Sequence, residues 1–361
     1  MSTWLDRIHT LVDKSGISKQ ALAECAGVDP STLYRYLKGQ QDMPSTVLMH
    51  LLERMDATMA DVLPAPAASH ILFRSDTVGA RELPAVQKVI RRFADYAWLE
   101  DMLMGEPVRE LSLASKLITH RKGNEADLAT LARSTRAAMG FSESGPIPSF
   151  MSCLQLTVKV LTYQLADTPD GFSVLEPDWG WCLAVNVANR PVERVLFTAA
   201  HELGHMVCGH LDMFSGNEKT AKDMEIEQVA NTFAGFFLVP SESLRAHWKG
   251  VNPGNRTLNM LHLCGLKSVY GVSYDCLLTR LLNEKIITGA TYGFWKSRLY
   301  PNNAPGEPDA LQTSPAYEER LRILTVQAFQ QEHISTLKVA ELLDMSFEAA
   351  WDYLREAAQN D

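Results

Sequence analysis

The spacing of hydrophobic residues predicts a chain made mainly of α-helices. Over residues 83–104, apolar side chains recur every three or four positions, which places them along one face of a helix. The same spacing predicts further helices over 125–139, 259–282, 318–331, 334–343 and 347–358. Within residues 259–282, the sequence Gly-Val-Ser at 271–273 is typical of a helix cap. Most of the chain is therefore expected to fold as packed helices.

In the middle of the chain the pattern changes to one typical of short strands. Residues 154–160 alternate between apolar and polar side chains, and residues 181–187 form an apolar run of strand length. Between them, Asp170-Gly171 indicates a turn, and a short strand can follow through Val174 and Leu175. The fold class expected is therefore mainly α with a small antiparallel β-sheet (α+β), the sheet packing against a neighbouring helix.

The first 66 residues contain two short helices joined by a turn. Ser18 can cap a helix that buries Leu22, and Gly27 ends it. Asp29 caps the next helix, with Pro30 in its first turn. Two short helices joined by a glycine-containing turn form a helix-turn-helix.

This segment resembles the XRE/Cro repressor family, in which a helix-turn-helix is followed by a glycine after the recognition helix, here Gly39. The resemblance implies a five-helix domain that binds operator DNA as a homodimer, with residues 30–38 in the major groove. The side chains expected to face bases or phosphates are Lys19, Ser31, Thr32, Arg35 and Lys38.

The charge of this segment limits how strongly it can bind DNA. Residues 1–66 hold eight Asp and Glu against six Lys and Arg, and the whole chain has a net charge of −9. Phosphate attraction supplies most non-specific affinity, so that affinity is expected to be weak and strongly dependent on salt. The competing interpretation is a helical module that binds only protein.

Residues 197–210 carry the most informative short pattern, His201-Glu202-x-x-His205. Positions four apart lie on one face of a helix, so both imidazoles can point at one zinc ion. Such an ion lowers the pKa of a bound water to roughly 7, and Glu202 can accept the proton of that water. The pattern therefore predicts metal-assisted hydrolysis.

A catalytic zinc needs a third protein ligand and one open position. Glu227 is the expected third ligand, and Asn231 lies four residues further along the same helical face. Asn231 can hydrogen-bond a ligating histidine and fix its tautomer. Glu225 is the weaker alternative, because it lies about 200° from Glu227 around the helix. The competing interpretation is a buried helix pair with histidines on its surface.

The sequence HELGH, followed by E-x-x-A-N-x-F-A-x-x-x-L-x-P, resembles the ImmA/IrrE family of metallopeptidases. That family is gluzincin-like, with two histidines from one helix and a glutamate from the next. The resemblance implies that His201, His205 and Glu227 bind Zn²⁺ and that Glu202 is the general base. Family members cleave repressor proteins of mobile elements or stress responses. Leu196 departs from the arginine that members often carry before the Phe-Thr pair.

Two neighbours of the histidine pattern have other interpretations. A metzincin would need glycine at 208 and histidine at 211, where this chain has Cys208 and Leu211. His210 is therefore expected to lie at a helix end without binding metal. Cys208 is expected to pack as a small apolar residue, and a thiolate that reaches the zinc or senses redox state is the alternative.

Length and composition are those of a globular protein with two or three domains. We expect a helix-turn-helix domain over 1–66, a zinc peptidase domain over 67–299, and an exposed linker with a helical segment over 300–361. The six cysteines lack C-x-x-C spacing, and no run of about 18 apolar residues occurs, so a cytoplasmic protein with reduced thiols and no membrane partner is expected.

Together these features predict a DNA-binding regulator with a zinc-dependent endopeptidase domain. Its expected substrate is a repressor or regulator protein bound nearby. The alternative is a transcriptional regulator in which the zinc domain is a sensor or is inactive. A pure protein-interaction module is a third possibility.

Overall fold

A computed structural model of the chain describes residues 4–41, 43–55, 57, 62, 70–73, 83–105, 124–166, 169–176, 178–210, 221–254, 257–301, 306–311 and 317–358. The chain divides into two compact units, Met1–Ala67 and Ala68–Asp361. No helix within the described ranges is long and apolar enough to cross a membrane.

The first unit is built from four described helices. These are α1 (Trp4–Ser15), α2 (Lys19–Cys25), α3 (Pro30–Leu37) and α4 (Ser45–Arg54). Their apolar faces form one core around Ile8, Leu22, Leu33 and Leu51. The turn between α2 and α3 passes through Gly27 at φ +67°, a backbone conformation that favours glycine. The fifth helix expected here falls on residues outside the described part of the chain.

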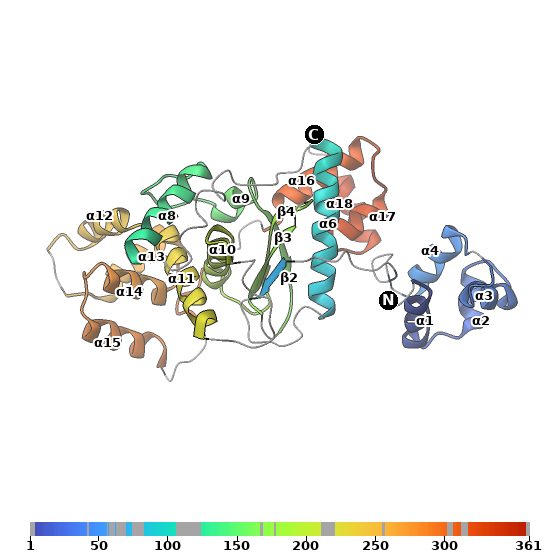
Figure 1. Ribbon diagram of the computed structural model, residues 1–361, viewed down its shortest axis with the longest axis horizontal. Helices are drawn as coiled ribbons and strands as arrows, with labels where there is room; N and C mark the ends of the chain where they lie inside the picture. The colour runs from blue at the N-terminus through green and yellow to red at the C-terminus, as the bar shows by residue number, and fades with distance from the viewer. Residues whose placement is uncertain are drawn as a thin grey trace. The chain divides into compact units, whose positions relative to one another are not determined.

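The second unit contains a four-stranded sheet between two groups of helices (Figure 1). Its strands are β1 (His70–Phe73), β2 (Lys159–Tyr163), β3 (Gly171–Glu176) and β4 (Gly180–Asn186), in the order β1-β3-β4-β2. Side chains alternate along β4: Trp181, Leu183 and Val185 join one hydrophobic core, and Cys182 and Ala184 join another. The sheet is therefore covered on both faces.

The sheet is mixed, which corrects the expectation of an antiparallel one. β1 and β3, and β3 and β4, pair antiparallel, but β2 pairs parallel with β4. The loop after β2 passes the end of β4, so β3 forms on the far side of β4 and cannot pair with β2. Asn186 holds that loop, since its amide nitrogen donates to the carbonyl oxygens of Leu165 and Pro169. The expected α+β fold class is otherwise confirmed.

The strand expected over 154–160 begins later than the alternation suggests. Residues 150–154 form a short helix, α9 (Phe150–Leu154), and β2 starts only at Lys159. Leu154 is fully buried at the end of this helix, so its side chain packs without a strand around it. Apolar alternation over so few residues does not separate a strand from the end of a buried helix.

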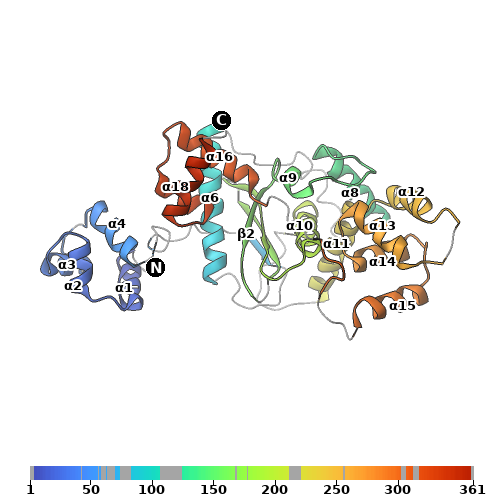
Figure 2. The same cartoon turned by 180° about the vertical axis from the view of Figure 1, so that it is seen from behind.

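One face of the sheet is covered by α6 (Pro84–Met104) together with the three last helices (Figure 2). These are α16 (Glu319–Gln330), α17 (Thr336–Leu343) and α18 (Phe347–Ala357). Buried ion pairs join them: Arg92 on α6 pairs with Glu318 at 2.5 Å, and Lys159 on β2 pairs with Glu100 on α6 at 2.7 Å. The C-terminal helices therefore share a core with the sheet.

The other face carries α10 (Val192–Val207) and α11 (Ala221–Leu238), with the remaining helices packed around them. These are α8 (Glu125–Ala138), α12 (Ser241–Val251), α13 (Met260–Tyr270), α14 (Tyr274–Asn283) and α15 (Gly289–Leu299). The break at 271–273 separates α13 from α14: Gly271 lies at φ +63°, and Ser273 caps α14 by accepting from the backbone N–H of Cys276.

The segment after α15 is not simply the exposed linker that its turn-rich sequence predicts. Glu307 is buried, accepts from Lys267 at 2.6 Å, and also accepts from the backbone N–H of Tyr274 at 3.0 Å. Residues typical of turns predict a segment without helix or strand. That prediction does not say whether a side chain in the segment is buried, as the carboxylate of Glu307 is here.

Candidate metal centre

The two helices α10 and α11 approach each other closely because Gly204 has no side chain. A Cβ at this position would lie 2.9 Å from the ring of Phe233 and 3.3 Å from the carbonyl oxygen of Ala230. The first distance is shorter than real Cβ atoms show and the second is tighter than most, so only glycine permits this spacing without a shift. Gly204 stands inside the histidine pattern, and the close approach brings both histidines against α11.

The structure brings together the three side chains that spacing predicts as ligands. His201 Nε2 lies 3.3 Å from one carboxylate oxygen of Glu227, and His205 Nε2 lies 3.4 Å from the other. The two Nε2 atoms are 2.9 Å apart, and one donor atom from each of the three residues falls within 4.8 Å of the others. Both histidines are fully buried, whereas the Glu227 side chain is 24% exposed. Among these three ligands, Glu227 is therefore the one that solvent reaches.

Each histidine contacts a second polar group through its other ring nitrogen. The Oδ1 of Asn231 lies 2.9 Å from His201 Nδ1, so that nitrogen carries the proton and Nε2 presents a lone pair to the centre. Nδ1 of His205 lies 2.9 Å from Nδ1 of His210, which is itself fully buried. These contacts fix the orientation of both rings.

His210 is a residue whose position the sequence does not reveal. It was expected at a helix end, and α10 does end at Val207, but the chain then turns back through Gly209 at φ +68°. This turn returns His210 to the ring of His205, with the two ring centroids 5.1 Å apart. The glycine before it was the available signal, since a left-handed turn after a helix reverses the chain direction.

The electrostatics of the three side chains suit a divalent cation. Burial by itself raises the pKa of Glu227, but the adjacent imidazoles of His201 and His205 more than offset this and hold that pKa well below its usual range. The residue is therefore a carboxylate at neutral pH. Two imidazoles and one carboxylate form the N/O donor set that zinc takes in catalytic sites with three protein ligands, so the residues present fit that ion.

Glu202 lies beside the centre on the sheet side of α10. It is fully buried, and one of its carboxylate oxygens accepts a hydrogen bond from the hydroxyl of Ser173 on β3. Gly171 allows α10 this close to the sheet, because a Cβ there would lie 2.6 Å from Thr198 and 3.0 Å from the carbonyl oxygen of Ala184. The serine contact was not predicted, since no local pattern relates β3 to α10.

The two alternative ligands do not reach the centre. Cys208 is fully buried, and burial raises the pKa of its thiol to about 12, which keeps it neutral. This agrees with the interpretation of Cys208 as a packing residue. Glu225 is exposed and is not one of the three residues whose donor atoms converge.

The residues expected to contact DNA lie on the surface of the first unit. Four of them are exposed and Thr32 is partly so; the exposed ones are Lys19, Ser31, Arg35 and Lys38. The Ser31 and Thr32 hydroxyls donate to the carboxylate of Asp29, at 2.5 and 2.6 Å, and Asp29 caps α3 by accepting from the backbone N–H groups of the same two residues.

Tyr34 was not predicted as a contact residue. Its side chain is 53% exposed on α3, and the ammonium of Lys38 lies 5.8 Å from its ring centroid. Tyr34 is three residues after Ser31 and four before Lys38, so helical spacing alone places it on the same face.

Comparison with protein families agrees with both resemblances. Residues 7–67 match the model of the Cro/C1-type HTH DNA-binding domain, and residues 153–282 match the IrrE N-terminal-like domain, a model of peptidase family M78. A search of curated proteins found no match to the chain. The second match contains all residues of the candidate metal centre described above.

Proposed function

We propose that this chain, which carries a Cro/C1-type HTH domain and an IrrE N-terminal-like domain, is a DNA-binding regulator with a zinc-dependent endopeptidase unit. Its substrate is a repressor or regulator protein of a mobile element or a stress response. The observation that carries the proposal is the convergence of His201, His205 and Glu227 on one point with Glu202 beside it.

Zinc bound by these three residues would lower the pKa of a coordinated water to roughly 7 and polarise the substrate carbonyl. Glu202 then accepts the proton of the attacking water and later delivers it to the leaving amine. The Ser173 hydroxyl, which donates to Glu202, orients the carboxylate for both transfers. Asn231 and His210 hold the ligating rings in place.

Binding of the helix-turn-helix unit to an operator holds the peptidase unit at that site on DNA. A regulator bound at the same operator would meet the peptidase at a high effective concentration, set by the linker and the spacing of the two binding sites. DNA binding by residues 30–38 thereby selects which regulator is cleaved. The residues proposed for this contact are Lys19, Ser31, Thr32, Arg35 and Lys38, with Zn²⁺ as the cofactor of the second unit.

The test is to incubate the purified full-length protein with the product of the neighbouring repressor-like gene, with and without a zinc chelator. We expect discrete fragments that the chelator abolishes. The matched control is Glu202→Gln, which should keep zinc but cleave about 10²- to 10⁴-fold more slowly, because the proton acceptor is gone.

Cleavage by Glu202→Gln at the wild-type rate would refute the general-base role. Stoichiometric zinc with no cleavage of any regulator would instead favour the alternative, in which the zinc unit is a sensor in a transcriptional regulator.

A further inference from the structure

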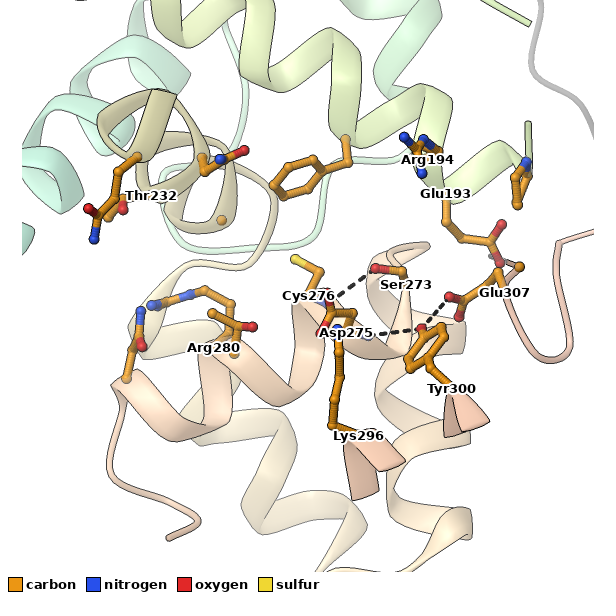
Figure 3. A pocket seen from close by; sticks show the side chains of 18 of the residues that line it. Glu193, Arg194, Thr232, Ser273, Asp275, Cys276, Arg280, Lys296, Tyr300 and Glu307 are labelled. Carbon is orange, nitrogen blue, oxygen red and sulfur yellow. Dashed lines mark hydrogen bonds and ion pairs between the residues drawn. The ribbon is translucent and has the colours of Figure 1, made fainter. Parts of the chain in front are cut away.

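A groove of about 710 Å³ lies beside the candidate metal centre, between α10 and α11 on one side and α14 and α15 on the other (Figure 3). Phe197, four residues before His201, and Asn231, four residues after Glu227, line its near end. A rise of 1.5 Å per helical residue puts that end about 6 Å from the ligands along each helix. The groove therefore lies within reach of a peptide held at the centre.

One end of the groove is acidic. Glu193 from α10, Asp275 from α14 and Glu307 all line it, and Figure 3 shows Glu193 reaching toward Glu307 from the opposite wall. Lys267 lies 2.7 Å from Glu193 and 2.6 Å from Glu307, so a single ammonium serves two buried carboxylates.

One carboxylate oxygen of Glu193 takes no part in these contacts. The side chain is fully buried, and its Oε1 accepts both from Lys267 and from the backbone N–H of Leu311, at 2.9 Å. Its Oε2 is buried and has no hydrogen-bond partner in the described part of the chain. An unpaired carboxylate oxygen in such a position is costly unless a donor reaches it.

The charges at this end do not balance. The three carboxylates Glu193, Asp275 and Glu307 face two ammonium groups, since Lys296 pairs with Asp275 and Lys267 serves the other two. These five side chains together carry one net negative charge. Arg194, another cation that lines the groove, lies 2.5 Å from Asp170, a carboxylate that Arg190 also contacts at 3.0 Å.

The distance from the metal ligands fits a nearby residue of a bound peptide. Glu193 precedes His201 by eight residues on α10, which is about 12 Å along the helix axis. An extended peptide spans about 3.3–3.6 Å per residue, so this equals three or four residues. Phe197 lies between the two positions and offers an apolar surface for the methylene stem of a long cationic side chain.

We propose that the acidic end of the groove is a subsite for a lysine or arginine side chain of the protein substrate, three or four residues from the cleaved bond. The ammonium or guanidinium donates to Oε2 of Glu193 and balances the net negative charge of these five side chains. This inference rests on the proposed peptidase function, but its test does not require cleavage.

The test measures binding to the full-length, zinc-loaded Glu202→Gln protein. Two pools of fluorescein-labelled, N-acetylated octapeptides are compared by fluorescence anisotropy, identical except that one contains lysine where the other contains the neutral norleucine. We expect the lysine pool to bind at least about tenfold more tightly, the size of one hydrogen bond between charged groups.

A second substitution tests whether Glu193 causes the preference for lysine. Adding Glu193→Gln should reduce the difference between the pools to less than about twofold, since glutamine keeps an oxygen for Lys267 but loses the charge. Glu125→Gln is the matched control, because Glu125 also lines the groove but lies exposed at the start of α8. It should leave the preference intact.

Each outcome decides the inference separately from the peptidase proposal. Equal binding of the two pools, or a lysine preference that survives Glu193→Gln, would overturn the subsite even if the protein cleaves a regulator. If Glu193→Gln fails to fold, as judged by circular dichroism and zinc content, the half-exposed Asp275→Asn replaces it, with a reduction of about threefold expected from a weaker, solvated contact.

Discussion

The candidate metal centre and the recognition helix α3 differ in how completely the folded chain positions their side chains. At the centre, His201 and His205 are fully buried, and each contacts a second polar residue through its outer nitrogen. On α3, by contrast, Arg35 and Lys38 are exposed, and among the described residues their side chains contact Thr32 and Tyr34 of the same helix. The side chains of the centre are therefore held in place by the rest of the unit, whereas the exposed side chains of α3 are not.

The hydroxyl groups of Ser31 and Thr32, at the start of α3, are held by hydrogen bonds within the protein. Hydrogen bonds from Ser31 and Thr32 to Asp29 hold the pKa of that carboxyl well below its usual range. Both hydroxyl protons are thus used within the protein, and the two oxygens remain acceptors. Phosphate only accepts hydrogen bonds, so these two hydroxyls have no proton to offer it while they donate to Asp29.

The largest expected effect comes from removing the outer partners of the histidines. Asn231→Ala and His210→Ala should each weaken zinc binding by roughly 10- to 100-fold, because the ligating ring loses its fixed tautomer and orientation. Competition with a chromogenic chelator measures the affinity. Affinity equal to wild type in both variants would show that the rings are held by packing alone.

A comparable effect is expected from the glycine that sets the helix spacing. Gly204→Ala places a Cβ 2.9 Å from Phe233, so α10 and α11 must separate. We expect a loss of about 1–3 kcal/mol in the free energy of unfolding, as for other overpacked sites, together with weaker zinc binding. Denaturant unfolding of the zinc-free protein isolates the packing part. Gly250→Ala, where a Cβ meets nothing within 4 Å, is the control.

The smallest effect is expected on α3. Arg35→Ala should weaken operator binding by about 1 kcal/mol, roughly fivefold, because one exposed contact among several is lost. Lys38→Ala should instead lower binding to all sequences and reduce the salt dependence by about one phosphate contact. A gel shift over a range of salt concentrations separates the two. An unchanged shift for Arg35→Ala would contradict the placement of this face in the groove.

The sequence predicts the features that depend on the spacing of residues close together in the chain. His201 and His205, and then Glu227 and Asn231, are pairs four residues apart, so a helix brings each pair onto one face whatever the rest of the fold does. The helix-turn-helix likewise follows from Gly27 and the caps around it. These features need no knowledge of which distant segments meet.

The rest depends on contacts between segments far apart in the chain. Ser173 reaches Glu202 only because β3 packs under α10, and β2 pairs with β4 only because a loop passes the end of that strand. The sequence around Glu307 predicts an exposed, turn-rich linker, yet the side chain of Glu307 is buried against Lys267. In each case the packing of the whole unit determines which residues meet. A local sequence pattern carries no information about that packing.

The most direct test of the account is the zinc content of the purified protein and of His201→Ala, measured by elemental analysis after dialysis against metal-free buffer. We expect one zinc per wild-type chain and less than about a tenth of that in the variant, because two remaining ligands hold zinc poorly. One zinc per chain retained by a folded His201→Ala protein would contradict the assignment of this centre.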